Sequence, residues 1–408
     1  MIYLKKILLL CSNYSKDANG ICVKNIASEL KNNGNQVYVI SNSGTDENKE
    51  LDLSEATVYA VRQSWFSKIS KKFESNKSLV EKLIYKMISL LRHIFLIPFY
   101  PNVSPLRSRY VYRLSKKIVE EYGIDTIIAT YRPYESIYAA LKLKKKYGDE
   151  LTVIDYHLDI LTDSNTSSSF ARKFQYARAC KVVEKERAIL DKLILPESIR
   201  SRVGNISNIE FTDFPVYVPN QIEEACDFQF DSNAYNIAYV GTLNVENRNP
   251  SYVISFLNKI NEKSEQPFVL HIWGNVSREI LDYLKNSKYI KYHGLVEHQY
   301  VMNLLKRADL LLNITNKNTI NMLPSKIFQL FAAQKPILNF VKNRNDCSLP
   351  YFKKSRVTFN IYEDTDISEQ EFGVLQFIDG IDRSNIKVNE ELLYKCTPKH
   401  LINIIEGI

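Results

Sequence analysis

Short apolar runs alternate with amphipathic stretches along nearly the whole chain. The runs are five to eight residues long and rich in Val, Ile, Leu and Tyr, which is typical of buried β-strands. In the first half they occupy 6–13, 36–41, 56–61, 125–131, 151–157 and 192–196, and in the second half 236–243, 268–274, 289–294, 309–314, 335–340 and 357–362. Strands that alternate with helices favour parallel βαβ units.

Helical periodicity is clearest in "ICVKNIASELKNNG", which starts at Ile21. Its apolar residues fall on one stripe, and Gly34 follows as a typical C-terminal stop. Four further helices are predicted near 250–263, 277–286, 297–308 and 324–333. The pattern therefore predicts two tandem doubly wound α/β domains.

A chain of 408 residues is too long for one ordinary core, which also favours two domains. The acidic segment "VPNQIEEACDFQFDSNAY" separates the two series of strands. We expect an N-terminal Rossmann-like, acceptor-binding domain at 1–218, a linker at 219–235 and a second Rossmann-like domain at 236–408. The last helix is a candidate for packing back on the first domain. Ligands bind at the carboxyl ends of such strands, so a cleft between the domains is the expected site.

Composition places the chain among ordinary globular proteins, because 45% of its residues are apolar and 25% are charged. The six cysteines are scattered, without a C-x-x-C pair or a zinc-like His spacing, and we expect reduced thiols in the cytoplasm. The apolar run Ile7–Cys11 is shorter than the core of a signal peptide, so it predicts a first strand rather than a secretion signal.

The formal charge of +8 is concentrated in one segment, since 62–117 holds 13 basic and 2 acidic residues. Within it, 78–101 is apolar around most of a helix, interrupted by Lys82, Lys86 and Arg92. This pattern favours a helix lying on an anionic membrane surface, with 68–117 as the contact region. A buried helix with a solvated basic side is the alternative. Nucleic acid is disfavoured, because no aromatic-interleaved recognition motif is present.

Several signatures are missing, namely G-x-G-x-x-G after the first strand, the P-loop, G-x-S-x-G and H-E-x-x-H. Their absence weighs against a dehydrogenase, a P-loop NTPase, an α/β-hydrolase and a zincin. One D-x-D motif occurs at Asp364–Asp366 inside an acidic tract. A solvated loop explains it better than a metal site does.

The segment "INMLPSKIFQLFAAQKPILNF" is typical of an anion-binding turn. Pro324 suits the first turn of a helix, where the N–H groups of Ser325 to Ile327 would be available to a phosphate. Lys326 and Gln329 are three apart and would share an exposed face, so they could reach the phosphate and the ribose of one ligand. An ordinary amphipathic helix that begins with proline is the alternative reading.

Four blocks, "GTLNVENRNP", "HIWGN", "YHGLVEHQYVMNLLKRADLLLNI" and "LPSKIFQLFAAQKPIL", follow one another in the order found in a known family. Together they resemble the C-terminal domain of family-4-like glycosyltransferases of the GT-B fold, of the bacterial cell-surface polysaccharide type. The resemblance covers about 236–362, and the first half matches only in general layout.

The resemblance implies a metal-independent hexosyltransferase without a cofactor. Its substrate would be a nucleotide-diphosphate sugar, and its acceptor a glycan or a lipid-linked saccharide. The enzyme would work at the inner face of the cell membrane. The residues implied in donor binding are Gly241, Arg248, Asn321, Pro324, Ser325, Lys326 and Gln329.

Three positions depart from the family pattern. Asn321 and Gln329 stand where the family commonly has two glutamates, the first near the donor sugar and the second on the ribose. Gln334 replaces a glycine. An amide still accepts a hydrogen bond from a hydroxyl, but the stronger charge-assisted bond is lost. A non-catalytic GT-B partner or scaffold with a degenerate donor site is therefore the alternative function.

The first half offers two candidate groups. Asn19 and Gly20 follow the first strand, where the family would bind an acceptor or a phosphate, although Gly20 could equally be a plain turn residue. Asp155, His157 and Asp159 follow another strand, with structural hydrogen bonding as the alternative role. If transfer inverts the anomeric centre, one of these three would deprotonate the acceptor hydroxyl. If transfer retains it, the leaving diphosphate could do so, and the sequence leaves both open.

Overall fold

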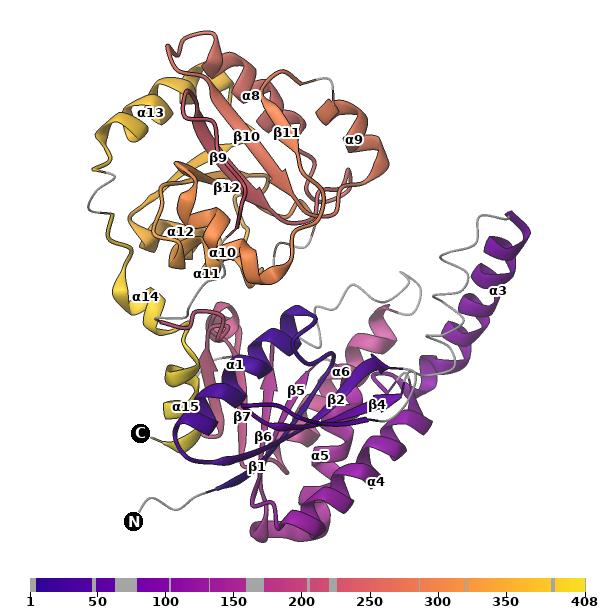
Figure 1. The fold of residues 1–408 in the computed structure, drawn as a ribbon. Helices are drawn as coiled ribbons and strands as arrows, with labels where there is room; N and C mark the ends of the chain where they lie inside the picture. The colour runs from indigo at the N-terminus through magenta and orange to yellow at the C-terminus, as the bar shows by residue number, and fades with distance from the viewer. Residues whose placement is uncertain are drawn as a thin grey trace. The chain divides into compact units, whose positions relative to one another are not determined.

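The chain forms two compact α/β units (Figure 1). The computed structural model describes residues 5–45, 49–62, 79–102, 104–131, 133–158, 172–203, 206–219, 226–285, 287–318, 320, 322–382 and 386–407. The first unit comprises Met1–Val216 together with Pro398–Ile408, and the second comprises Tyr217–Thr397.

The first unit contains an eight-stranded sheet in the order β3-β4-β2-β1-β5-β6-β7-β8. The strands are β1 (Lys6–Cys11), β2 (Gln36–Thr45), β3 (Lys49–Asp52), β4 (Thr57–Arg62), β5 (Thr126–Tyr131), β6 (Thr152–His157), β7 (Lys192–Pro196) and β8 (Ile209–Thr212). Neighbouring strands pair in parallel except β3, which runs antiparallel to β4. All six predicted strands are present. The pattern missed the two edge strands, β3 and β8, which are only four residues long.

Seven helices of the first unit are described. They are α1 (Ala18–Asn32), α3 (Leu79–Leu96), α4 (Pro105–Tyr122), α5 (Tyr134–Tyr147), α6 (Arg172–Arg187), α7 (Arg200–Val203) and α15 (Pro398–Glu406), with 3₁₀ turns η1 (Ile97–Phe99), η2 (Gly148–Glu150) and η4 (Glu197–Ile199). Side chains of α4, α5 and α6 share one core with β1, β5 and β6. Helices α1 and α15 pack together, and α1 also contacts β1 and β2. The last helix thus belongs to the first unit.

The second unit contains a six-stranded parallel sheet in the order β11-β10-β9-β12-β13-β14. The strands are β9 (Tyr235–Val240), β10 (Phe268–Trp273), β11 (Ile290–Tyr292), β12 (Leu310–Ile314), β13 (Ile337–Val341) and β14 (Thr358–Tyr362). Each lies within one residue or two of a predicted strand at its start. Fully buried strand interiors explain why continuous apolar runs located them so well.

Seven helices of the second unit are described: α8 (Ser251–Asn261), α9 (Arg278–Lys285), α10 (His298–Arg307), α11 (Lys326–Ala332), α12 (Leu349–Ser355), α13 (Ile367–Gly380) and α14 (Glu390–Tyr394). Helices α8, α9 and α13 share a core with one face of the sheet. Helices α10, α11 and α12 lie on the other side (Figure 1). There the ring pairs Phe328–Tyr351 and Phe331–Phe352 join α11 to α12.

The predicted linker at 219–235 needs correction at its C-terminal end, because part of it packs on the second unit. Phe228 makes edge contacts with the rings of His271, Trp273 and His293, at centroid distances of 5.5, 5.0 and 4.8 Å. Aromatic edge contacts of this kind anchor an extended segment to a sheet. The second unit therefore starts earlier than the predicted residue 236.

The chain enters and leaves the second unit at adjacent points. The N–H of Tyr217 donates to the carbonyl of Cys396 at 3.0 Å. Tyr217 is the first residue of that unit, and Thr397 is its last. The two ends of the second unit therefore lie side by side.

Candidate functional site

The order of strands in the second sheet marks one place where a ligand is expected. From β9 the chain runs outward to β10 and β11, and it then returns to β12 on the other side of β9. Loops after β9 and β12 therefore diverge at their carboxyl ends, which leaves a crevice in doubly wound sheets. Here the two loops are tied together, since Lys317 N–H donates to Asn247 O at 3.1 Å and Asn318 Nδ2 donates to Glu246 O at 2.8 Å.

Two cationic side chains meet one buried tyrosine near the carboxyl ends of β9 and β12. The Nζ of Lys326, at the start of α11, lies 3.3 Å from Tyr239 Oη and 4.5 Å from the centre of that ring. Arg248, in the loop after β9, donates from Nε to Asn316 Oδ1 at 2.9 Å. The two loops and α11 thus contribute to one cluster of Tyr239, Arg248, Asn316 and Lys326, which we call the cationic cluster.

Gly241 leaves room for this arrangement. A Cβ atom at Gly241 would lie 3.0 Å from Lys326 Nζ and 3.2 Å from Tyr239 Oη, closer than side chains normally approach. The neighbouring Gly274 is under a harder constraint, because its Cβ would lie 2.1 Å from the carbonyl oxygen of Gly241. Both glycines therefore follow from close approach at the ends of β9 and β10.

Burial disfavours the charged form of Lys326 in the cationic cluster. Burial lowers the pKa of Lys326 well below its usual range, and the nearby charge of Arg248 lowers it further. Burial raises the pKa of Tyr239 to about 12, although Arg248 opposes that rise. Burial also raises the pKa of Asp346, against the effect of Ser348 and Arg248. An anion between Arg248 and Lys326 would favour the charged form of the lysine.

The structure corrects two expectations about the Pro324 turn. Lys326 does not lie on an exposed face, since the residue is half-buried and its ammonium faces Tyr239. The N–H of Ile327 is not available to a phosphate, because it donates to Pro324 O at 3.2 Å. The N–H of Phe328 similarly donates to Ser325 O at 3.2 Å. The helix also begins two residues later than expected, at Lys326 instead of Pro324.

The other predicted donor residues are placed as follows. Pro324 and Ser325 are half-buried just before α11, and Gln329 is half-buried within it. Ile327, Leu330 and Phe331 form the buried stripe that the periodicity predicted. Asn321 lies outside the described residues. The roles of Asn321 and Gln329 toward sugar and ribose therefore stay predictions.

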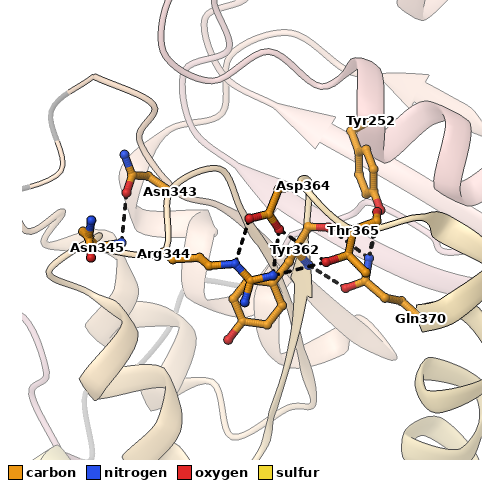
Figure 2. A network of polar contacts seen from close by, with 8 residues as sticks. All are labelled: Tyr252, Asn343, Arg344, Asn345, Tyr362, Asp364, Thr365 and Gln370. Atoms are coloured by element: carbon orange, nitrogen blue, oxygen red, sulfur yellow. Dashed lines mark hydrogen bonds and ion pairs between the residues drawn. The ribbon is translucent and has the colours of Figure 1, made fainter.

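The D-x-D motif is used by the protein itself (Figure 2). Arg344 donates from Nε and Nη2 to the two oxygens of Asp364 at 2.7 and 2.8 Å, and its guanidinium lies over the ring of Tyr362. Asp366 is the N-cap of α13 and accepts from Ser368 N–H at 2.8 Å. These contacts favour the structural reading of the motif.

In the first unit, Asn19 lies at the corresponding divergence of β1 and β5. Thr130 Oγ1 donates to Asn19 Oδ1 at 3.1 Å, and Asn19 Nδ2 donates to Tyr131 O at 3.4 Å. The neighbouring Gly20 is required by packing, because its Cβ would lie 1.8 Å from the carbonyl oxygen of Asn13. Its N–H donates to the Asp17 carboxylate at 2.7 Å. A phosphate at this helix start would compete with that carboxylate.

Asp155 and His157 lie side by side at the carboxyl end of β6, and His157 Nε2 is 2.9 Å from Asp155 Oδ2. The sequence reading missed a third member, Glu186 of α6, whose Oε2 lies 3.9 Å from the same nitrogen. The three residues are 0%, 2% and 0% exposed, in sequence order. Burial raises the pKa of Asp155, and it raises the pKa of Glu186 to about 8 with help from Asp155. Asp159 lies outside the described residues.

The sequence analysis did not predict three residues of these two sites, and only one of them carries a local signal. Asn316 lies in the polar run "TNKNT" directly after a strand, so the rule for strand ends could have found it. Tyr239 and Glu186 lie inside a strand and a helix, where no local signal distinguishes them from ordinary core or surface residues.

Comparisons with known proteins identify the fold. No protein-family model matches the chain, and no curated protein sequence matches it. Among solved structures, the chain is similar to TarM, with a TM-score of 0.61 and 12% identity over 100% of this chain and 99% of that one. It is also similar to an α,α-trehalose-phosphate synthase (UDP-forming) from Burkholderia xenovorans, with a TM-score of 0.60 and 11% identity over 98% and 99%. A third similar structure is that of WaaG, a glycosyltransferase involved in lipopolysaccharide biosynthesis. Its TM-score is 0.54, and the identity is 12% over 98% of this chain and 100% of that one.

These neighbours, whose chains are matched almost from end to end, include glycosyltransferases of the GT-B fold. The protein therefore has the GT-B fold, built from two Rossmann-like α/β units, as the sequence resemblance predicted. At such identities the likeness establishes the fold and leaves the reaction to be argued from the site.

Proposed function

We propose that the protein is a glycosyltransferase that moves a sugar, a hexose, from a nucleotide-diphosphate donor to a glycan or lipid-linked saccharide. The observation that carries this proposal is the cationic cluster at the divergence of β9 and β12. A buried ammonium and a guanidinium converge on one tyrosine there, in a fold that the neighbours use for sugar transfer. The resemblance to family-4-like enzymes of cell-surface polysaccharide synthesis supports the same reading.

In this proposal the second unit binds the donor through its diphosphate. Lys326 and Arg248 neutralise the negative charge that grows on the leaving phosphate as the sugar bond breaks, which stabilises the transition state. Gly241 keeps the space that the ammonium needs. Ser325 and Gln329 on the same turn are the candidates for further phosphate and ribose contacts, and Asn321 for the sugar. We propose no cofactor and no metal in this step.

The proton acceptor is a separate question. Asp155 and His157 are buried, which weighs against direct contact of either with an acceptor hydroxyl. Asp159 remains a candidate if transfer inverts the anomeric centre, and the leaving diphosphate remains one if transfer retains it. Asn19, in the first turn of α1, is the acceptor-side candidate, and its side chain has polar contacts with Thr130 and Tyr131 at the end of β5.

We further propose that the protein works at the inner face of the cell membrane, attached to anionic lipid through 68–117. Among the described side chains of helix α3, six large apolar ones are exposed, namely Leu83, Met87, Leu90, Leu91, Ile94 and Phe95. Lys86 is exposed beside them. An exposed apolar face within a strongly basic segment suits a surface of anionic lipid. Within the part of the chain that is described, no helix has the length and apolar content needed to cross a bilayer.

A second function is favoured by one observation, the amides at Asn321 and Gln329 where the family commonly has glutamates. A GT-B partner or scaffold without transferase activity could carry such a degenerate donor site. This alternative predicts that the cationic cluster no longer binds nucleotides.

Titration calorimetry with UDP-, GDP- and dTDP-sugars separates the two functions. The proposal expects one of these donors to bind and the Lys326→Ala variant to bind it more weakly. Slow release of free sugar or of the nucleoside diphosphate from the bound donor would then show that the site breaks the sugar bond. No binding of any donor to a correctly folded protein would favour the non-catalytic partner.

A further inference from the structure

The first unit holds a buried group of three potential ligands that the proposed donor chemistry does not use. Asp155 and His157 come from β6, and Glu186 comes from α6. One ligand atom from each lies within 4.8 Å of the other two. All three side chains are buried, so water does not reach them freely.

Three of the four carboxylate oxygens of this group have no hydrogen-bond partner among the described residues. Asp155 Oδ1 and both oxygens of Glu186 are buried without a hydrogen bond among the described residues. Buried polar atoms are nearly always hydrogen-bonded, and buried charges are nearly always paired or bound to a metal. Three unpaired oxygens in one group therefore point to a missing positive species.

Among the described residues, no hydrogen bond or ion pair joins a lysine or an arginine to these carboxylates. Arg178 of α6 donates from Nε to the backbone carbonyl of Tyr100 at 2.9 Å. On the other side, the ring of Tyr131 stacks on His157 at a centroid distance of 5.2 Å. His157 thus faces two carboxylates, and it can carry at most one positive charge.

We propose that Asp155, His157 and Glu186 bind a divalent transition-metal cation, with Zn²⁺ or Mn²⁺ as the best-suited class. One imidazole nitrogen and carboxylate oxygens suit such ions better than Ca²⁺ or Mg²⁺, which prefer oxygen ligands alone. Two ligands of a tetrahedral zinc lie about 3.3 Å apart when each bond is about 2.0–2.1 Å. The observed separations of 2.9 and 3.9 Å from His157 Nε2 lie on either side of that value.

The cation would link β6 to α6 inside the first unit, so its first role would be to hold the carboxyl end of that strand. This role is independent of the donor site, which lies in the second unit. The proposal adds a metal to a protein whose sequence resemblance implies metal-independent transfer, and it assigns the metal no step in the transfer.

Binding is measured on the full chain after chelation and dialysis, by calorimetry with Zn²⁺ and Mn²⁺ and by the visible absorption of Co²⁺. We expect one equivalent per chain and an increase in thermal stability on binding. Glu186→Gln keeps the shape of the side chain and removes a charged ligand, so affinity should fall by about tenfold or more. Glu184→Gln is the matched control, since that exposed glutamate lies on the same helix two residues away.

Two results would overturn the proposal. The first is the absence of stoichiometric binding to the parent protein, which would mean that the carboxylates share a proton instead. The second is equal affinity of the parent, Glu186→Gln and Glu184→Gln proteins, which would mark an adventitious ion elsewhere. If Glu186→Gln does not fold, His157→Gln serves as the ligand variant. If neither variant folds, the measurement of metal binding to the parent protein decides. Nucleotide titration tests the donor site in the second unit, so a failure of that proposal can be distinguished from a failure of the metal-site proposal.

Discussion

The ammonium of Lys326 is poorly solvated in the free protein, and this makes it the most informative residue of the candidate donor site. Its contacts are a tyrosine hydroxyl and ring, and its nearest charged influence is the like charge of Arg248. Burial costs the charged form, and a bound diphosphate would offset that cost.

Substitutions on the α11 turn should weaken nucleotide binding in a definite order. Lys326→Ala removes a charge-assisted contact worth about 1.5–3 kcal/mol, or roughly a ten- to hundredfold loss of affinity. Gln329→Ala removes a weaker, neutral contact and should lie between, while Gln329→Glu should match the parent or exceed it. Titration calorimetry gives the order, with Lys353→Ala, at an exposed position of α12, as the control. A flat series in folded proteins would mean that this turn does not bind nucleotides.

Nucleotide binding should also take up protons at alkaline pH. The pKa of Lys326 is lowered in the free protein and should rise when a diphosphate arrives, so affinity should fall as pH increases above the lowered value. Between this lowered pKa and the lysine pKa of about 10.4 in the unfolded chain, the unfolded chain binds the extra proton. The contribution of Lys326 to the free energy of unfolding therefore increases with pH in that range. Calorimetry at about pH 9 in buffers of different ionisation enthalpy measures the uptake. Proton uptake that persists in Lys326→Ala would assign it to another group.

Gln334 occupies a backbone conformation that suits glycine. Its φ is 51°, in the left-handed region, directly after α11. A non-glycine residue in this conformation destabilises the fold by about 1–2 kcal/mol. Glycine avoids that cost, but part of the gain is offset because glycine has more conformational freedom in the unfolded chain. Gln334→Gly should therefore raise the free energy of unfolding by about 0.5–1 kcal/mol in urea titrations, whereas Gln334→Ala should not. Equal effects of the two substitutions would show that the backbone angle is not the cause.

At the scale of the element, the sequence predicted those strands and helices whose position is set by locally buried apolar residues. Every predicted strand is present because parallel strands buried on both faces leave continuous apolar runs. The four-residue edge strand β3 carries the sequence "KELD", which has no such run. The pattern also located α11, but not the turn that consumes the Ile327 N–H, because that turn depends on backbone angles at Ser325.

Helix α3 carries the prediction for membrane attachment. Liposomes with anionic lipid should retain the protein at low salt and release it as salt screens the attraction, over a Debye length of about 10 Å at 0.1 M. Lys86→Glu and Leu90→Glu should each weaken retention, since both residues are exposed on α3. Lys145→Glu on α5 changes the charge equally, outside the basic segment, and should have less effect. Equal recovery with neutral and anionic liposomes would contradict the proposal.

At the scale of the molecule, the sequence predicted two α/β units but not which distant residues meet. Glu186 reaches His157 across 29 positions, and Lys326 reaches Tyr239 across 87. Such contacts are set by the order of strands and the packing of helices, which one sequence does not specify locally. The order of four sequence blocks predicted the GT-B fold, whereas the partners within each site are set by the three-dimensional packing.

Because the ends of the second unit are adjacent, this unit is suited to separate expression and to exchange between proteins. Tyr217 and Cys396 are joined by a hydrogen bond, and the chain returns to the first unit only for α15. The second unit is therefore an insertion, so residues 217–397 made alone should fold and bind nucleotide, as circular dichroism and calorimetry would test. Residues 1–216 alone would leave α1 without α15 and should be prone to aggregate. Under the proposed function, replacing residues 217–397 with the matching segment of another GT-B protein would exchange the donor-binding unit and keep the rest of the chain, so donor choice could be changed in one step.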